Sequence, residues 1–486
     1  MKQKIISLCI LTFFSYSCNN QKIVINNGYA ITNITIIDPI EGVSEKMTII
    51  IIDNRIAQLD KSKNINLSNT NIIYDGTGKY IIPGLWDFHV HFSFIKDLAP
   101  SMFNLFIGYG ITSVRDTGGE LEFVQQWKQK SIKSPNISPR VKIAGPLIDG
   151  EKNVYDGSSN SYPKLSIQNK DEDAIKANLE FLYSFGVDFF KAYEMLSPEQ
   201  FLLVTSYAKE KNMKVTGHVP LSMDVSSAID AGLNSMEHLR NLELSISTYS
   251  DELFNQRNEI LCCSDILKGS VLRSNIHNLQ RMPAVSTIDT NRMKLVFSKL
   301  AENEVSQIPT LNLYHGFSNY KFLDKNWSKS FNYLPLDISN KWKSEINNFR
   351  SSKPNENSQA FSKWMMNMVF EMRKYNIEFI SGTDTPIGYQ TPGYSLHDEL
   401  SLLSKSGLSN LEVIYSATYA PAKYFNMEDS LGAIQRNRIA DLIILNNNPI
   451  EDIENTKDIW SVIKNGNYFD RLELDSLLNS QRPKNF

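Results

Sequence analysis

The chain has 486 residues, more than one small hydrophobic core needs and enough for a large barrel with a second domain. Its composition is typical of a soluble globular protein, with 42% hydrophobic and 21% charged residues and a formal net charge of −3. A charge so close to neutral gives no reason to expect a nucleic acid or an anionic membrane surface as a partner.

Residues 1–18, MKQKIISLCILTFFSYSC, have the features of a bacterial export signal. Two lysines precede an apolar run from Ile5 to Phe14, which is too short for a permanent membrane-spanning helix. The segment resembles a lipoprotein signal, with Cys18 as the lipidated first residue of the mature chain. Acyl chains on Cys18 would anchor the protein to a membrane, facing the periplasm or the cell exterior. The alternative is an ordinary signal peptide in which Cys18 is incidental.

Short β-branched runs separated by turn residues fill the segment from about residue 28 to 82, as in AITNITIIDP and KMTIIIIDNRIAQL. This pattern is typical of a small antiparallel sheet. It returns near the C-terminus in GAIQRNRIADLIILNNNPI and IWSVIKNGNYF. We expect residues 19–82 and 427–470 to form one discontinuous β-sandwich, with residues 471–486 as a tail.

Strand-like and helix-like segments alternate between these two ends. The first strand lies in YIIPGLWDFHVHF, and seven more follow it: ITSVRDTGG, RVKIAGPLI, VDFFKAYEM, KVTGHVP, NSMEHLRN, VSQIPTLNLYH and IEFISGTDTP. Eight strand–helix alternations predict an α/β fold with a (β/α)8 barrel over residues 83–426. A long polar stretch at about 240–300 interrupts the pattern, and we expect this insertion to lie over the barrel mouth as a lid or substrate wall.

The first barrel strand ends on two histidines, His89 and His91, which are two positions apart. Side chains alternate between the faces of a strand, so both imidazoles point to the same side. In a barrel that side is the interior, at the C-terminal mouth where active sites lie. Two imidazoles held there can bind one divalent metal, although a lone His-x-His pattern also arises by chance.

Other predicted strands also end on a polar residue: Lys191, His218, His238 and Asp384 close strands four, five, six and eight. A lysine at the end of a buried strand is costly unless it is neutral, paired or modified. An uncharged lysine amine can take up carbon dioxide to give a carbamate, whose two oxygens can bridge two cations. The strand ends therefore offer a complete set of metal ligands once Lys191 is carbamylated.

Several motifs in this order resemble the amidohydrolase superfamily of metal-dependent hydrolases, and its imidazolonepropionase-like and prolidase-like branch most of all. The motifs are PGLWDFHVHF, GITSVRDTGG, FFKAY, GHVP, SMEHL, SGTDTP, SLHDEL, ATYAPAKYF and LGAIQRNRIADLIILNNNPIEDI. They extend over nearly the whole mature chain.

The resemblance implies a centre with two divalent metal ions. The ligands would be His89, His91 and Asp384 at the first ion, His218 and His238 at the second, and the carbamate of Lys191 between them. Such ligands suit zinc, although Mn, Fe or Co could substitute. A hydroxide shared by the metals would attack the substrate, and Asp384 would take its proton and pass it to the leaving amine.

The sequence departs from the dipeptide-cleaving relatives at two positions that help to hold the substrate. Those relatives carry a histidine after the third strand and a tyrosine two residues past the fifth-strand histidine. Here the third strand runs into AGPLIDG, and the fifth reads His218-Val219-Pro220. A dipeptidase activity is therefore not predicted, even though the metal chemistry is.

Four further residues have two interpretations each. Arg115 could clamp a substrate carboxylate or form a structural salt bridge. Tyr193 could contact substrate or only pack the barrel mouth. His315 could contact substrate or lie on a loop that faces solvent. His397 could order the loop after strand eight or support Asp384.

The predicted function is hydrolysis of a carbon–nitrogen bond in a small amide, cyclic amide or peptide-like substrate. One alternative is a one-metal deaminase or cyclic-amide hydrolase. Lys191 distinguishes the two-metal enzyme from this alternative, because one-metal relatives generally lack that lysine. The other is a surface-anchored binding protein that has kept the barrel but lost catalysis.

Overall fold

The computed structural model describes residues 22–68, 71–263 and 267–480. The predicted export signal and its lipidation site, Cys18, lie outside the described residues. Among the helices in the described part of the chain, none is both long enough and apolar enough to cross a bilayer.

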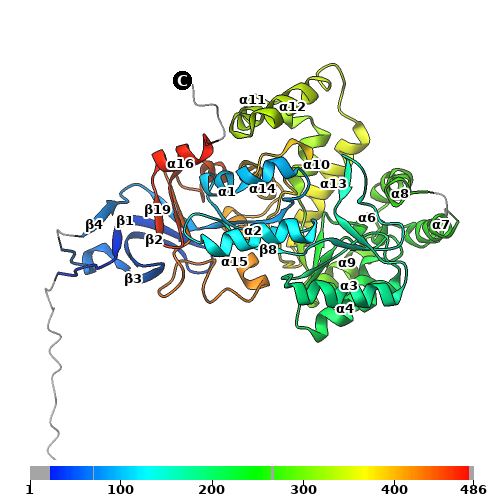
Figure 1. Ribbon diagram of the computed structural model, residues 1–486, viewed down its shortest axis with the longest axis horizontal. Coiled ribbons are helices and arrows are strands. Elements are labelled where there is room, and N and C mark those ends of the chain that lie inside the picture. The colour runs from blue at the N-terminus through cyan, green and yellow to red at the C-terminus, as the bar shows by residue number, and fades with distance from the viewer. Residues whose placement is uncertain (1–21, 69–70, 264–266, 481–486) are drawn as a thin grey trace, which may run out of the picture.

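The two ends of the chain meet in one eight-stranded sheet, drawn in blue and in brown to red in Figure 1. The strand order is β19-β18-β17-β5-β1-β2-β3, with β4 beside β1. The strands are β1 (Gly28–Asp38), β2 (Gly42–Ile52), β3 (Arg55–Lys61), β4 (Ile72–Asp75), β5 (Tyr80–Pro83), β17 (Leu442–Leu445), β18 (Ile459–Lys464) and β19 (Asn467–Phe469). Antiparallel pairing of β17 with β5 joins the C-terminal strands to the N-terminal ones. Buried isoleucines from both ends of the chain, such as Ile49 and Ile444, share one core.

Within the described residues, eight parallel segments form the barrel. They are β6 (Leu85–Val90), β7 (Ile111–Asp116), β8 (Arg140–Ile143), β13 (Phe190–Ala192), β14 (Val215–Gly217), β15 (Ser235–Glu237), β16 (Ser306–Ile308) and residues 378–385. Parallel bridges from Thr385 to Val90 and from Phe379 to Gln307 place the eighth segment between β6 and β16. On the other side, the amide of Asp188 donates to Ile143 O (2.8 Å) and links β8 to the β13 region. The predicted (β/α)8 fold is confirmed.

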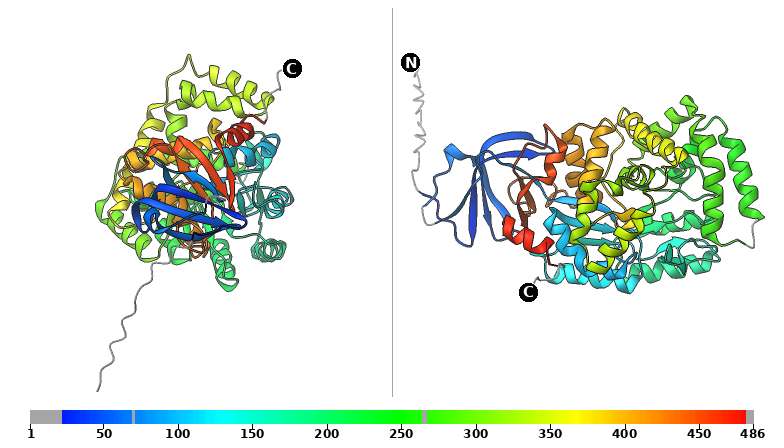
Figure 2. Two further views of the ribbon diagram at one scale, coloured as in Figure 1. Left: turned by 90° about the vertical axis from the view of Figure 1, so that its left-hand side faces the viewer. Right: turned by 90° about the horizontal axis from the view of Figure 1, so that it is seen from above.

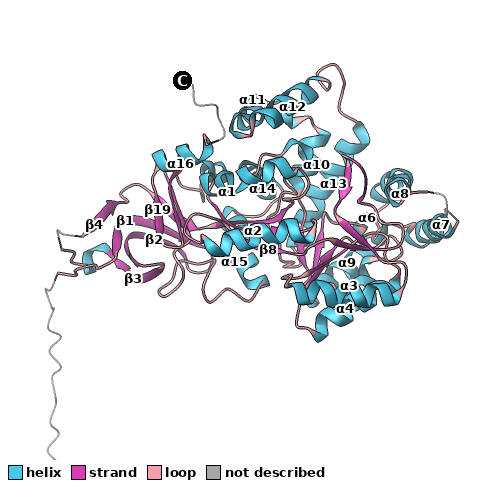
Figure 3. Ribbon diagram, viewed as in Figure 1, coloured by secondary structure: helices cyan, strands magenta, loops and turns pink. Residues whose placement is uncertain are grey.

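Helices cover the outside of these strands, as the cyan coils around magenta arrows show in Figure 3. They are α1 (Ala99–Gly108), α2 (Leu121–Lys133), α3 (Glu172–Phe185), α4 (Pro198–Glu210), α5 (Val225–Asp230), α9 (Thr290–Glu302), α13 (Glu356–Arg373), α14 (Tyr394–Lys405) and α15 (Asn410–Tyr424). In α3 the buried residues Ile175, Leu179 and Leu182 recur at helical spacing, and the side chain of Asp171 caps the first turn. The C-terminal helix α16 (Arg471–Leu478) packs on α1.

Three segments extend the barrel at its mouth. After β8 come β9 (Leu147–Asp149), β10 (Asp156–Ser159), β11 (Tyr162–Lys164) and β12 (Ser166–Gln168). Residues 240–300, the predicted insertion, form α6 (Leu242–Ser245), α7 (Ser250–Cys262) and α8 (Gly269–Val285) and then enter α9. After β16 come α10 (Leu311–Ser318), α11 (Lys325–Ser330) and α12 (Leu336–Asn347). The right-hand view of Figure 2 shows the blue terminal sheet at one end of the molecule and the green helices of the insertion at the other.

Candidate metal centre

The side chains that close the predicted strands meet in one cavity of about 210 Å³ at the barrel mouth. Six of its lining residues are those singled out from the sequence: His89, His91, Lys191, His218, His238 and Asp384. All six are buried, and none is more than 6% exposed. Groups that are scattered over three hundred positions of the chain therefore share a site from which bulk water is largely excluded.

The backbone at this site is unusual in three places. His238 and Asp384 follow their strands with φ of 58° and 69°, a left-handed conformation that side-chain-bearing residues rarely adopt and that clusters at functional sites. Gly382 lies so close to the first strand that a Cβ there would be 2.9 Å from both the backbone N and the Cβ of His89. A glycine at this position therefore allows Asp384 to approach His89 at the end of β6 and His91 just after it.

All four imidazoles are held through their Nδ1 atoms. The hydrogen bonds join His89 to Glu237 Oε2 (2.7 Å), His91 to Gly118 O (2.8 Å), His218 to Glu194 Oε1 (2.6 Å) and His238 to Thr310 Oγ1 (2.6 Å). A carbonyl or carboxylate oxygen can only accept, and the Thr310 hydroxyl donates to Pro309 O, so Nδ1 is the donor in every case. Each Nε2 thereby carries a lone pair, as at metal sites where imidazole ligands are oriented through Nδ1, and that of His91 has the Thr117 hydroxyl 3.5 Å away.

Asp384 lies beside three of these Nε2 atoms. Its Oδ1 is 3.0 Å from Nε2 of His91 and 3.3 Å from Nε2 of His89, and its Oδ2 is 3.7 Å from Nε2 of His238. The ligand atoms of His89, His91 and Asp384 lie within 4.8 Å of one another, close enough to share one metal ion. Oδ1 is buried and makes no hydrogen bond to any described residue. A cation between these atoms would satisfy a carboxylate oxygen that is otherwise costly to bury.

Lys191 presents a second buried polar atom without a hydrogen-bond partner among the described residues, its Nζ. The nearest acid is Glu237, whose Oε1 is 3.6 Å away. Burial lowers the pKa of Lys191 to about 8, although the charge of Glu237 opposes this shift. The amine therefore loses its proton more readily than an exposed lysine, and its Nζ has room for a bond to carbon dioxide.

At His91, burial lowers the pKa, but the neighbouring Asp384 outweighs burial and raises the pKa above its usual value. Burial favours the neutral form of the other three imidazoles. It lowers the pKa of His89 to about 4 and the pKa of His218 and His238 well below their usual range. For Asp384, burial raises the pKa, but the neighbouring His89 and His91 outweigh it and hold the pKa below its usual value. Neutral imidazoles and an ionised carboxylate are the protonation states in which these groups bind a cation. The residues present therefore fit a divalent metal centre.

Two buried glutamates that the sequence reasoning missed support the histidines. Glu237 Oε1 accepts from Nη2 of Arg115 at 2.6 Å, while its other oxygen binds His89. Glu194 accepts from His218 on one oxygen and from Nε2 of His277 on the other, both at 2.6 Å. Both glutamates stand next to residues already chosen, because Glu237 precedes His238 and Glu194 follows Tyr193. Their strand-end position was the signal that could have found them.

Arg115 and His315, for which the sequence left a substrate contact open, do not line this cavity. Arg115 is fully buried, donates from Nε to Phe88 O (2.6 Å) and packs over the ring of Phe88, so its position favours the salt-bridge interpretation. His315 lines a separate surface pocket with Lys321. The reason is helical geometry, since successive residues of α10 point about 100° apart, so that Leu313 and Tyr314 line the cavity and the next residue, His315, does not.

Tyr193 and His397 are placed differently from each other. The ring of Tyr193 lines the cavity, with its centroid 4.4 Å from that of His218. His397 is buried and binds Thr456 Oγ1 and Tyr109 O, both at 3.0 Å. It thus connects α14 to other parts of the fold and makes no hydrogen bond to Asp384.

Two residues of the insertion, Arg273 and His277, also contact the candidate site, Arg273 as part of the cavity wall and His277 through Glu194, although the sequence reasoning assigned them nothing. Both lie on α8, one helical turn apart, and both bind Glu194. No spacing rule connects an inserted helix to a barrel strand, so the sequence carried no signal for this contact.

Similar proteins are found both by sequence and by structure. The sequence model of the amidohydrolase family matches residues 80–468. A dihydroorotase from Syntrophotalea carbinolica is 43% identical over 61 residues, a match that spans 13% of this chain and 14% of that protein. Among solved structures, a Xaa-Pro dipeptidase with methionine bound in its active site is 20% identical, covers 91% of this chain and 100% of its own, and superposes with a TM-score of 0.65. The bottromycin amidohydrolase is 17% identical, covers 94% of this chain and 90% of its own, and has a TM-score of 0.69.

Proposed function

The chain belongs to the amidohydrolase family of hydrolases that act on carbon–nitrogen bonds, and we propose that it cleaves a small amide, cyclic amide or peptide-like substrate at a centre of two divalent metal ions. The observation that carries this proposal is the common orientation of the four imidazoles. Each is fixed through Nδ1, so that four Nε2 atoms, Asp384 and the Nζ of Lys191 line one buried cavity.

The proposed ligand sets follow the contacts in the site. His89, His91 and Asp384 would hold the first ion, since their ligand atoms are already clustered. His218 and His238, whose ring centroids are 4.8 Å apart, would hold the second. Zinc is the metal proposed, because imidazole and carboxylate ligands suit it. When bound, the metals would activate a water molecule as the nucleophile and polarise the scissile carbonyl.

Lys191 would join the two sites as a carbamate. Attack of its neutral Nζ on carbon dioxide forms one N–C bond and releases one proton, and no oxidant or reductant is needed. The orphaned Nζ and its position beside the Nε2 cluster support this step.

Asp384 would handle the proton of the reaction. Its carboxylate lies within 3.7 Å of three imidazoles and is held ionised by His89 and His91. Oδ2 would accept the proton of the attacking water and donate it to the amine nitrogen as the carbon–nitrogen bond breaks.

We also propose that the protein is an exported lipoprotein anchored through Cys18, which rests on the leader sequence alone. Replacing Cys18 with serine should release the protein from the membrane fraction, and mass spectrometry of the mature N-terminus should find acyl chains in the unaltered protein. A soluble, unacylated mature protein would contradict this proposal.

The test of the hydrolase is metal removal and return. Protein stripped by a chelator should not hydrolyse acyl-amino acids, dipeptides or small lactams, and reconstitution with Zn²⁺ should restore turnover of at least one class. Turnover that is unchanged by chelation would refute the metal-dependent mechanism, and no turnover of any amide after full metal loading would refute the proposed reaction.

A further inference from the structure

We propose that Arg240 and Arg273 form a carboxylate-binding site beside the metal centre, and that an adjoining cavity under α8 takes a large apolar group. The substrates would then be N-acyl amino acids, with a free carboxylate on the amine half and a long or bulky acyl chain. This inference rests on the proposed hydrolysis of amides and specifies its substrate class.

The two arginines reach the same cavity from different elements. Arg240 stands two residues after His238, whereas Arg273 comes from α8 of the insertion. Both line the cavity that contains the six proposed metal-site residues. A carboxylate placed between them would therefore lie beside an amide positioned at the metals.

The hydrogen bonds of the two arginines leave donors available. Arg273 donates from Nε to Glu194 Oε1 at 2.9 Å, so the N–H groups of its two terminal nitrogens are not used in that bond. Arg240 donates from Nη2 to the hydroxyl of Tyr314 at 2.9 Å. Its Nε is buried and makes no hydrogen bond to any described residue, although Glu194 Oε1 is 3.5 Å away. The guanidinium of Arg240 is thus incompletely satisfied in the part of the chain that the structure describes.

The charges of this cluster favour an anionic ligand. Two guanidinium groups share the single carboxylate of Glu194, which also accepts from His218 and His277. Arginine stays protonated at any physiological pH, so the cluster has an excess of positive charge in a buried site. A carboxylate would neutralise that excess, and the planar fork of a guanidinium matches its two oxygens.

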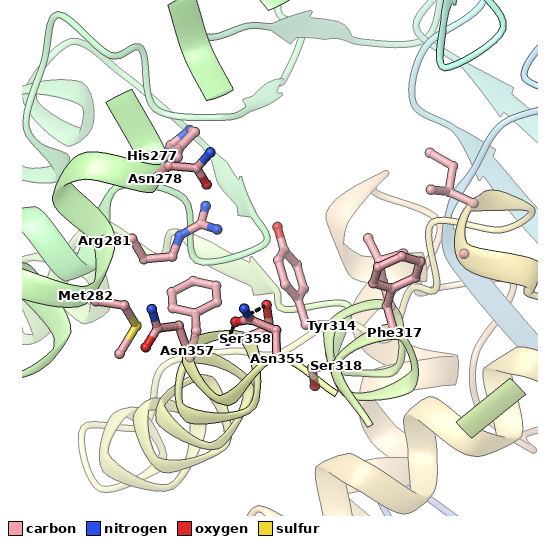
Figure 4. A pocket seen from close by; sticks show the side chains of 14 residues that line it. His277, Asn278, Arg281, Met282, Tyr314, Phe317, Ser318, Asn355, Asn357 and Ser358 are labelled. Atoms are coloured by element: carbon pink, nitrogen blue, oxygen red, sulfur yellow. Dashed lines mark hydrogen bonds between the residues drawn. The ribbon is translucent and has the colours of Figure 1, made fainter. Parts of the chain in front are cut away.

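A second cavity of about 600 Å³ adjoins the metal cavity and shares three lining residues with it: Leu313, Tyr314 and Ile387. Figure 4 shows Arg281 on α8 facing Tyr314 on α10 across this space, with Met282 of the same helix near Asn357. The other apolar walls are Phe317 on α10 and Phe361 on α13, and polar side chains such as Asn278 and Ser358 line the rest of the cavity. This volume lies within the range of small-molecule sites and exceeds what one small side chain needs. A long acyl chain would bury apolar surface here while its amide stays at the metals.

The experiment compares matched substrates on the metal-loaded enzyme. The methyl ester of N-decanoylglycine replaces the negative charge of the acid with a small methyl group, and both compounds release decanoate on amide hydrolysis. We expect kcat/KM to favour the acid by about 10- to 100-fold, the usual effect of a hydrogen bond between charged groups. N-acetylglycine should be cleaved at least about 10-fold less efficiently than N-decanoylglycine. Equal efficiency for acid and ester, or for acetyl and decanoyl, would overturn the corresponding half of the proposal.

The variant Arg273→Met should reduce the acid-to-ester ratio toward one, chiefly through a higher KM for the acid. A merely structural role would slow both substrates equally and leave the ratio unchanged, which would contradict the proposal. Arg292→Met is the matched control, because Arg292 pairs with Asp251 near the surface and lines neither cavity. It should keep the wild-type ratio. Arg273→Lys should recover part of the preference because it restores the charge without the fork.

A binding measurement separates failure of this inference from failure of the proposed reaction. The probe is the ketone isostere of N-decanoylglycine, in which CH2 replaces the amide N–H so that it cannot be hydrolysed. Calorimetry on the metal-loaded protein should show binding that weakens about 10- to 100-fold in Arg273→Met and for the methyl ester of the probe. Binding with this pattern supports the carboxylate site even if no amide is turned over. If the amide bonds of the acid and of its methyl ester are hydrolysed equally well and binding shows no such pattern, the carboxylate site is refuted. The proposed hydrolysis of amides is then still supported.

Discussion

Replacing Glu194 with glutamine should weaken one of the two proposed metal sites and leave the other nearly intact. The carboxylate of Glu194 accepts from Nδ1 of His218 at 2.6 Å and so fixes the ring with Nε2 toward the cavity. A hydrogen bond to a charged group contributes about 1.5–3 kcal/mol. Its loss corresponds to a fall of about 10- to 150-fold in affinity, in line with the 10- to 100-fold typical of groups that orient metal ligands.

The physical reason is the loss of charge. A glutamine oxygen can still accept from one donor, but its amide N–H2 then faces the donors of Arg273 or His277, which now bind the two carboxylate oxygens. Competition with a chromophoric chelator would measure the dissociation constant of each metal. We expect the ion at His218 to bind about 10- to 100-fold more weakly and the ion at His89 to change little.

Glu378→Gln is the control, because Glu378 pairs with Lys423 near the surface and contacts none of the proposed ligands. Two dissociation constants that are unchanged in Glu194→Gln would refute the reasoning that Nδ1 contacts position the imidazoles. Equal weakening of both ions would also refute it, since it would point to general unfolding of the site.

Three further predictions test other parts of the account. Lys191→Ala should lose metal and activity, with partial rescue of turnover by added acetate or propionate; two bound metals and full turnover in elemental analysis and assay would contradict the bridging role. Asp441 is buried, which raises its pKa, but Lys464 and a neighbouring arginine outweigh burial and hold the pKa at about 2, below the usual 3.8. The ionised carboxylate therefore stabilises the fold by about 2 kcal/mol above pH 3.8, and this stabilisation is lost as the pH falls through 2. In chemical denaturation at pH 7, Asp441→Asn should lower the free energy of unfolding by at least about 2 kcal/mol, and a wild-type value would refute this. Gly382→Ala should reduce metal content and lower the melting temperature, because its Cβ would lie 2.9 Å from the backbone of β6; wild-type metal content would contradict this.

The barrel and the position of its site were accessible from sequence for a simple reason. Parallel strands in a barrel all end at the same rim, so polar residues that close apolar strands are expected to lie together at that rim. His218 and Asp384 are far apart in the chain but line the same cavity. The alternation of strands and helices predicted the fold, and the strand ends predicted which side chains meet.

The remaining features depend on contacts that no local pattern encodes. Arg273 enters the site from an inserted helix, and its approach depends on how α8 packs over the barrel. Arg115 stands at a strand end like the proposed ligands, yet it binds Glu237 beneath the site, because a charge so deeply buried needs a carboxylate to pair with. His315 and Tyr314 are neighbours in sequence, and the phase of α10 decides which of them faces the cavity.

The most direct measurement is a crystal structure of the zinc-loaded protein with anomalous diffraction data collected at the zinc edge. The account predicts two ions per chain, each bound by Nε2 atoms, with extra density on Nζ of Lys191 that reaches both ions. A protein that binds no metal in this cavity after reconstitution, or that binds it through Nδ1 of these histidines, would contradict the account.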